Sequence, residues 1–406
     1  MPSGAAVGGR LFRFARTLGL VVLAATVSAP ASAPLSAPAF AQSVPDQALH
    51  QAARSDDTAL AAFALERGGD PETRDQLGNT ALQVAAIYGS AGVAAALLDG
   101  GADPAAATPD DDWTALHYAA YEGHDRVAQV LIKAGAPLEA RERDYGNTPL
   151  LVAARRNKRA VVSALLAAGA DHAARDRRDG NTALINAAFD PLATTVVAEL
   201  LAAGAAPDSA AEDGMTALMA AARAGSEGSL QMLLAGGAEA GSRRRDGWTA
   251  LHLAAAHGHT PSFDDLLAAG AAVDQRAAEG ETPLGQAIQA GHVDSVIALL
   301  EAGANIEQPG RSGRPPVVLA AMNGQAGALY VLLNAGADTD AREAETGNTA
   351  LMLAANRARL EEIRLLLGAG ADVTLKAKDG WTALQAATMI GDDEIAALLR
   401  QAGARE

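Results

Sequence analysis

Three histidines, His252, His257 and His259, form the only local cluster of potential metal ligands in the chain. Imidazole nitrogens bind zinc well, so metal chemistry would be expected here first. A zinc site needs several ligands around one ion, and no Asp, Glu or Cys stands at ligand spacing inside this cluster. We therefore predict no metal site and no cofactor, and we keep a metal-dependent enzyme only as a less favoured alternative.

Other residues that could do chemistry also lack the arrangement that catalysis needs. Adjacent acids such as Glu361-Glu362 and Asp264-Asp265 point apart on a helix, because neighbours in sequence lie on different faces. The phosphate-binding, nucleophile and His-Glu motifs of common enzymes are missing, and the chain has no cysteine to act as a nucleophile. We predict that the protein is not an enzyme and has no catalytic residues.

The elements around these residues repeat. The pattern Thr-Ala/Pro-Leu recurs at intervals of 33 or 34 residues, which is the length of one stacked supersecondary unit. We therefore predict an elongated array whose function depends on its outer surface, and not a globule around one core. The threonines of the pattern are Thr80, Thr114, Thr148, Thr182, Thr216, Thr249, Thr282, Thr349 and Thr382, and Pro315 begins a degenerate copy.

Each position of one unit has a mechanical role. In the unit that starts at Gly78, Thr80 is suited to cap the first helix and Gly89 to end it. A second apolar helix follows and ends at Gly101. The 12 or 13 residues from that glycine to the next threonine are rich in Asp, Arg and Gly, which predicts an extended finger with a tight turn.

The period, the Thr-Ala/Pro-Leu pattern and the recurring Ala-Ala, Leu-Leu and Gly-Ala pairs together resemble ankyrin repeats. His117 and His252 complete the Thr-Ala-Leu-His tetrapeptide of that family. The resemblance implies an all-α solenoid of about eleven helix-turn-helix units with β-hairpin-like fingers. Its expected parts are an N-terminal capping repeat at 42–73 and the repeat array at 74–406.

The first 41 residues have the character of an export signal. Three arginines precede the apolar run 18–27, which is too short to span a bilayer, and residues 39–41 (Ala-Phe-Ala) form a cleavage site. We predict a signal peptide at 1–41. A cut after Ala33 and an uncleaved anchor are the alternatives.

The amino-acid composition limits the cell compartments and the classes of partner that we expect. The chain has neither cysteine nor an Asn-x-Ser/Thr acceptor, which favours a bacterial periplasm, with secretion as an alternative. Its net charge is -16, and loss of the three signal arginines makes it more negative still. Such a charge repels phosphate backbones, so we expect no nucleic-acid partner, and no membrane insertion once the signal is removed.

Aromatic residues are only 3% of the chain, so their placement is informative. All three tryptophans precede a capping threonine, and four of the five tyrosines fall in units two to four. Trp, Tyr and Arg are the usual anchors of interfaces, and the two positions before the glycine between the helices vary from unit to unit. These features predict a protein-binding surface made of Tyr88, Trp113, Tyr121, Tyr145, Arg155, Arg156, Phe189, Trp248, Met322 and Trp381.

The finger arginines form a second candidate row. Arg141, Arg175, Arg243, Arg276 and Arg342, continued by Lys376, recur at a matching offset and could contact acidic side chains of a partner.

The sequence thus favours a monomeric, non-enzymatic scaffold of the periplasm that binds a protein partner through its concave face and finger loops. An immunity, inhibitor or chaperone-like protein for an envelope enzyme is the main alternative.

Overall fold

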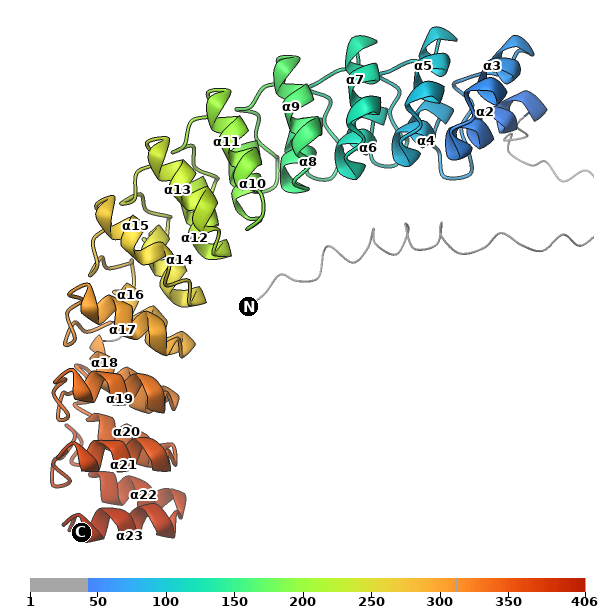
Figure 1. Cartoon of the computed structure of the whole chain (residues 1–406). Coiled ribbons are helices and arrows are strands. Elements are labelled where there is room, and N and C mark those ends of the chain that lie inside the picture. Colours follow the sequence, from blue (N-terminus) through green and yellow to red (C-terminus); the bar gives the residue numbers. More distant parts are fainter. Residues whose placement is uncertain (1–42, 311–312, 406) are drawn as a thin grey trace, which may run out of the picture. The chain divides into compact units, whose positions relative to one another are not determined.

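The computed structural model describes residues 43–310 and 313–405 of the chain (Figure 1). Over these residues the protein is helical, with 22 helices in eleven consecutive pairs and no strand. The predicted all-α repeat solenoid is confirmed. The predicted signal peptide at 1–41 lies outside the described residues and stays a prediction.

Each unit consists of a first and a second helix, and we number the units one to eleven in chain order. The first helices are α2 (Val44–Ser55), α4 (Ala81–Tyr88), α6 (Ala115–Glu122), α8 (Pro149–Arg155), α10 (Ala183–Ala188), α12 (Ala217–Ala224), α14 (Ala250–His257), α16 (Pro283–Ala290), α18 (Pro316–Asn323), α20 (Ala350–Asn356) and α22 (Ala383–Ile390). The second helices are α3 (Thr58–Glu66), α5 (Ala91–Asp99), α7 (Asp125–Lys133), α9 (Arg159–Ala167), α11 (Thr194–Ala202), α13 (Glu227–Ala235), α15 (Ser262–Ala268), α17 (Val293–Glu301), α19 (Ala326–Asn334), α21 (Leu360–Gly368) and α23 (Asp393–Gln401).

Capping chemistry fixes where the first helices begin and end. All nine threonines of the repeated pattern are N-caps. In unit two the Thr80 hydroxyl accepts from the Gln83 N–H at 3.3 Å, and the Gln83 side chain accepts from the Thr80 N–H at 2.8 Å. Gly89 then ends α4 with φ of 80°, a left-handed conformation that favours glycine.

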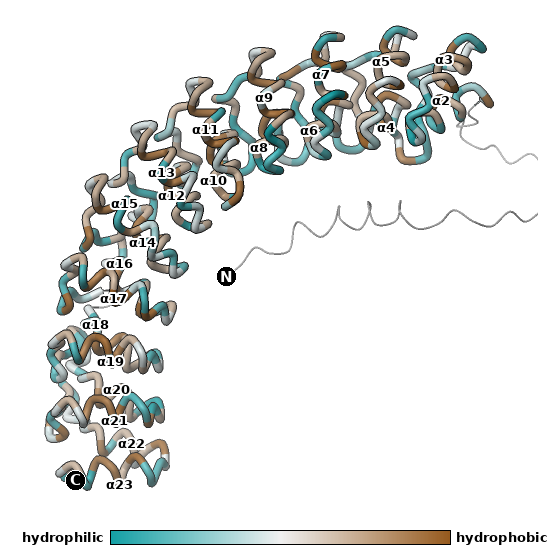
Figure 2. Tube along the Cα trace, viewed as in Figure 1, coloured by the Kyte–Doolittle hydropathy of each residue, from teal (hydrophilic) through white to brown (hydrophobic). Residues whose placement is uncertain are grey.

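The core is a continuous stack of small and branched side chains. Each first helix packs against the first helix of the next unit, and most second helices pack against the second helix that follows. The labels in Figure 1 run along the array in this order. Alanine pairs such as Ala85-Ala86 are fully buried and let the first helices approach closely. Hydrophobic colour accordingly runs along helices such as α19 and α21 in Figure 2. Stability therefore comes from packing within each unit and between neighbouring units.

The fingers contain single β-bridges, and no hairpin strands form in the described residues. In unit two the bridge joins Arg74 to Thr80. The tight turns depend on glycine: Gly247 has φ of 84°, and a Cβ there would lie 2.8 Å from the Ala278 backbone nitrogen of the next finger. Glycine is therefore favoured at position 247, because a side chain there would collide with the next finger.

Unit five departs from the pattern at the turn between its helices. Helix α10 has six residues, and its C-cap Phe189 has a right-handed backbone in place of the left-handed glycine. The Asp190 side chain accepts from the Leu192 N–H at 2.9 Å and shapes the replacement turn. This turn leaves the Leu192 side chain 83% exposed.

Candidate functional site

An aromatic cluster lies at the start of unit three. The Trp113 ring is 5.1 Å from the Tyr118 ring and 5.7 Å from the rings of His117 and Tyr121. Trp113 is only 9% exposed. Its side chain therefore supports Tyr121 from inside, and we remove Trp113 from the predicted binding surface.

The Tyr121 ring in turn contacts a basic residue of the next unit. The guanidinium carbon of Arg156 lies 4.3 Å from the centre of the Tyr121 ring, a cation–π contact that links unit four to unit three. Arg155 and Arg156 are both exposed, at the C-terminal end of α8. The contact orients the Arg156 guanidinium, and the residue as a whole stays exposed.

The corresponding helix ends in the flanking units carry exposed aromatic side chains. Tyr88 is 46% exposed at the end of α4, and Phe189 is 37% exposed at the end of α10. Since α4, α6, α8 and α10 pack in that order, these ends form one surface. We call it the turn surface, and it consists of Tyr88, Tyr121, Arg155, Arg156, Phe189 and Leu192. Leu192 was not predicted from the sequence, although the Pro191-Leu192 insertion in place of the usual glycine was the available signal.

The remaining predicted anchors do not join the turn surface. Tyr145, on the finger of unit four, lies half-buried under Arg178, whose guanidinium carbon is 5.3 Å from the ring centre. Trp248 and Met322 are partly buried against the core of their own units. Trp381 is 41% exposed in the last unit. The ten predicted residues are therefore not one site.

His117 and His252 are structural residues. Each is completely buried, and its Nδ1 accepts from the backbone N–H of the capping threonine at 3.2 Å. Each Nε2 donates to a carbonyl of the next finger, Asn147 at 3.0 Å and Glu281 at 3.2 Å. Burial lowers the pKa of both rings, to about 4 for His252. These imidazoles therefore tie consecutive units together in their neutral form.

The histidine side chains of unit seven make local contacts around the end of α14. His257 and His259 stack with ring centres 6.2 Å apart, and the His257 Nδ1 lies 2.9 Å from the Leu253 carbonyl oxygen. In residues 43–310 and 313–405, no three His, Cys, Asp or Glu side chains lie close enough to hold a metal ion.

The finger arginines link neighbouring fingers. Arg141 Nη1 donates to the Gly146 carbonyl of its own turn at 2.8 Å and to the Arg175 carbonyl of the next finger at 2.7 Å. Arg175 repeats the arrangement with Gly180 at 2.8 Å and Ala210 at 2.6 Å. The row is thus used for packing within the array, which limits its capacity to contact a partner.

Replacing Arg175 with methionine is expected to destabilise its finger locally. The change keeps a long apolar stem but removes two hydrogen bonds from a charged donor, a loss of about 1–2 kcal/mol. Hydrogen exchange should become faster in the fingers before Thr182 and Thr216 and stay unchanged elsewhere. Arg245→Met is the control, because the exposed Arg245 side chain makes no hydrogen bond to the described residues. Equal effects of the two changes would contradict this role.

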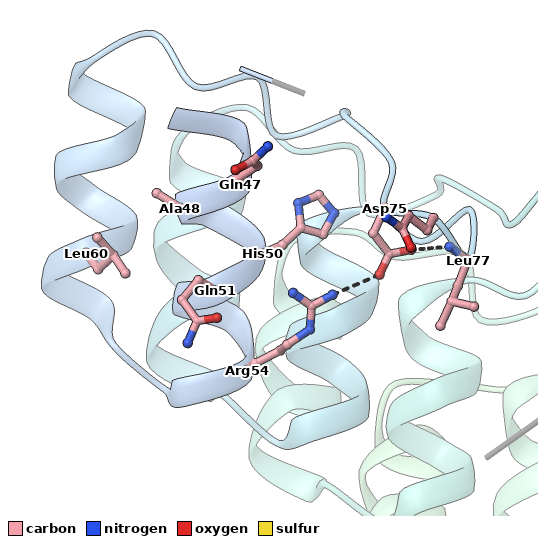
Figure 3. A pocket seen from close by; sticks show the side chains of 9 residues that line it. Gln47, Ala48, His50, Gln51, Arg54, Leu60, Asp75 and Leu77 are labelled. Carbon is pink, nitrogen blue, oxygen red and sulfur yellow. Dashed lines mark hydrogen bonds and ion pairs between the residues drawn. The ribbon is translucent and has the colours of Figure 1, made fainter. Parts of the chain in front are cut away.

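A hollow of about 670 Å³ lies beside the first helix pair (Figure 3). It is lined by His50 and Arg54 of α2, Leu60 of α3 and the Asp75 turn. Arg54 and Asp75 form an ion pair, since Arg54 Nη2 lies 3.1 Å from Asp75 Oδ2 and points toward it. His50 is bonded to backbone oxygens of Asp46 and Asn79 at 3.1 Å each. The lining is therefore part of the packing of the first finger.

No helix in the described part of the chain combines the length and the hydrophobicity needed to cross a membrane.

Comparisons with known proteins agree with this geometry. The family model described as "Ankyrin repeats (3 copies)" matches residues 49–142, 104–176, 150–244, 192–277, 218–310, 263–343 and 317–405. No curated protein matches the sequence. Among solved structures, the crystal structure of the human ASB11 ankyrin repeat domain is similar in fold, with a TM-score of 0.50 and 23% identity over 56% of this chain and 100% of that chain. Because the matched stretches extend from residue 49 to residue 405, the chain belongs to the ankyrin repeat family.

Proposed function

We propose that the protein is a non-enzymatic scaffold that binds a partner protein through the turn surface and the adjoining fingers. The repeat array itself indicates a protein-interaction module. The observation that supports this particular surface is the run of exposed Tyr, Arg and Phe side chains at the ends of α4, α8 and α10. These residue types dominate binding energy at interfaces, and helix packing within the array does not require their exposure.

We further propose that the partner belongs to a bacterial periplasm. The support is the sequence of residues 1–41, with its arginines, short apolar run and cleavage motif, together with the absence of cysteine. Fractionation of cells that express the tagged full chain tests this proposal. We expect the protein in the periplasmic fraction, starting at Gln42. Recovery in the cytoplasm with Met1 intact would contradict it.

Site-specific photocrosslinking tests the binding surface. A photoreactive amino acid at Tyr88 or Phe189 should give a discrete crosslinked species in cells that express the protein from its own gene. Tyr330 is the matched control, because it is an aromatic residue 57% exposed on the second helix α19. The same crosslink from all three positions would mean that the turn surface is not the specific contact.

Combined replacement of Tyr88, Tyr121 and Tyr145 by alanine gives the corresponding loss-of-function prediction. Interface aromatic anchors cost about 1–4 kcal/mol each when truncated, so the triple variant should lose the crosslinked partner. The far-UV circular dichroism spectrum should be retained, because Tyr88 is exposed and the other two are half-buried. Full partner recovery by the folded triple variant would exclude this surface.

A further inference from the structure

The turn between α8 and α9 is strongly basic on an acidic protein. Residues 145–170 contain no Asp or Glu, yet they carry Arg155, Arg156, Lys158 and Arg159, while the whole chain has a net charge of -16. Figure 2 shows this turn as a hydrophilic segment between apolar helices. A local reversal of the sign of charge is a feature that a charged partner can recognise.

Most of this basic group is not neutralised inside the protein. Arg159 is paired with Glu199, with Nε 2.6 Å from Oε1. In the described residues no ion pair joins Arg155, Arg156 or Lys158 to a carboxylate. Arg156 contacts the Tyr121 ring instead, and this contact satisfies none of its N–H donors. Three cations are therefore left without carboxylate partners next to one another.

Apolar side chains flank these cations in the neighbouring units. Phe189 and Leu192 are 37% and 83% exposed on the side of α10, and Tyr88 is 46% exposed on the side of α4. The first helices on both sides pack directly against their neighbours in the row. A ligand that crosses the turn surface thus meets an aromatic residue, then positive charge, and then an apolar pair.

We infer that the turn surface binds an extended acidic segment of the partner protein, with carboxylates on Arg155 and Arg156 and an apolar side chain against Phe189 and Leu192. Planar guanidinium groups match carboxylates in a two-bond geometry, and the apolar pair adds area that a purely ionic ligand would not use. A phosphate polymer is disfavoured, because nucleic-acid binding needs many cations along an extended path and the chain as a whole has a net charge of -16. This inference rests on the proposed function.

The test uses the purified full-length protein on an array of short peptides grouped by net charge. We expect binding to be concentrated on acidic peptides that contain Phe, Leu or Tyr, and to weaken as salt is raised. The double variant Arg155→Glu/Arg156→Glu should lose at least about tenfold in affinity for those peptides. Leu192→Ser should weaken binding of the apolar-containing acidic peptides selectively.

The matched control is Arg357→Glu in unit ten. Arg357 is an exposed C-cap of α20, just as Arg156 caps α8, and each is followed by a left-handed residue that is not glycine, Ala358 and Asn157. It is compared with Arg156→Glu alone, because these two single changes alter the net charge by the same amount. Arg357→Glu should leave peptide affinity within about twofold of the wild type, whereas Arg156→Glu should weaken it. An equal loss for both sites would show that only overall charge matters and would overturn the inference.

Two further arms separate the possible anionic ligands. Binding of a DNA duplex or of phosphatidylglycerol vesicles, with no preference among peptides, would overturn the inference in favour of phosphate recognition. Absence of any charge preference on the array would also overturn it. The proposed function is decided separately by the crosslink at Tyr88, which does not depend on the charge of the partner.

Discussion

Replacement of Phe263 by alanine is expected to lower the free energy of unfolding by about 3–5 kcal/mol, the largest effect of any single change considered for this protein. Phe263 is 2% exposed in α15 and is among the largest fully buried side chains of the chain. The corresponding positions in the flanking units hold the smaller Leu230 and Val296, so the neighbours cannot close the cavity that alanine would leave.

The effect should be confined to the middle of the array. Each unit packs against its immediate neighbours, so a weakened unit seven separates two blocks that otherwise unfold together. Urea denaturation followed by far-UV circular dichroism should change from one transition to two. Phe63→Ala is the control: Phe63 is 53% exposed on α3, and its loss should change stability by less than about 1 kcal/mol. A single transition with unchanged midpoint for Phe263→Ala would contradict the packing described for α15.

Acidification is expected to destabilise unit seven through His252. Burial holds the pKa of its imidazole at about 4, against about 6.5 in an unfolded chain. Protonation would also place a donor on Nδ1, opposite the Thr249 N–H that this nitrogen now accepts from. The unfolded state therefore binds the proton first, and stability is complete above about pH 6.5 and falls progressively toward about pH 4.

The expected size is about 2 kcal/mol between about pH 7 and about pH 5, and about 3 kcal/mol over the whole interval. His252→Gln should reduce this pH dependence and retain the fold. Unit two supplies the reason, because Gln83 occupies the same position and makes the same links without titrating: Oε1 accepts from the Thr80 N–H at 2.8 Å, and Nε2 donates to the Trp113 carbonyl at 3.0 Å. The free energy of opening of unit seven, measured by hydrogen exchange across this pH range, checks the prediction. If the free energy of opening depended on pH equally in the wild type and the variant, His252 would not be the cause.

The helical framework could be predicted from local chemistry. Thr80 and its equivalents mark helix starts, and glycines such as Gly89 and Gly258 mark helix ends, because capping depends on a few adjacent atoms. The structural role of His117 could be assigned for the same reason. Such features recur in most units, so each copy strengthens the interpretation of the others.

The candidate site could be predicted only in part, since the exposure of a side chain depends on which other side chains and units pack around it. Trp113 precedes a capping threonine just as Trp381 does, yet Trp113 is 9% exposed and Trp381 is 41% exposed. The difference arises because Tyr118 and Tyr121 cover Trp113, whereas no later unit of the described chain packs beyond α22 and α23. The finger arginines illustrate the same limit, because the carbonyl groups that Arg141 and Arg175 bond belong to the next finger.

The pairing of helices only with their nearest neighbours also bears on how the polypeptide acquires its structure during synthesis. No contact between helices requires distant parts of the chain to meet, so loop closure is short throughout and folding can proceed in the direction of translation. The α2–α3 pair can dock as soon as α4 has left the ribosome or a translocation channel. A nascent chain of this kind can therefore fold one unit at a time, and each folded unit provides the surface against which the next unit packs.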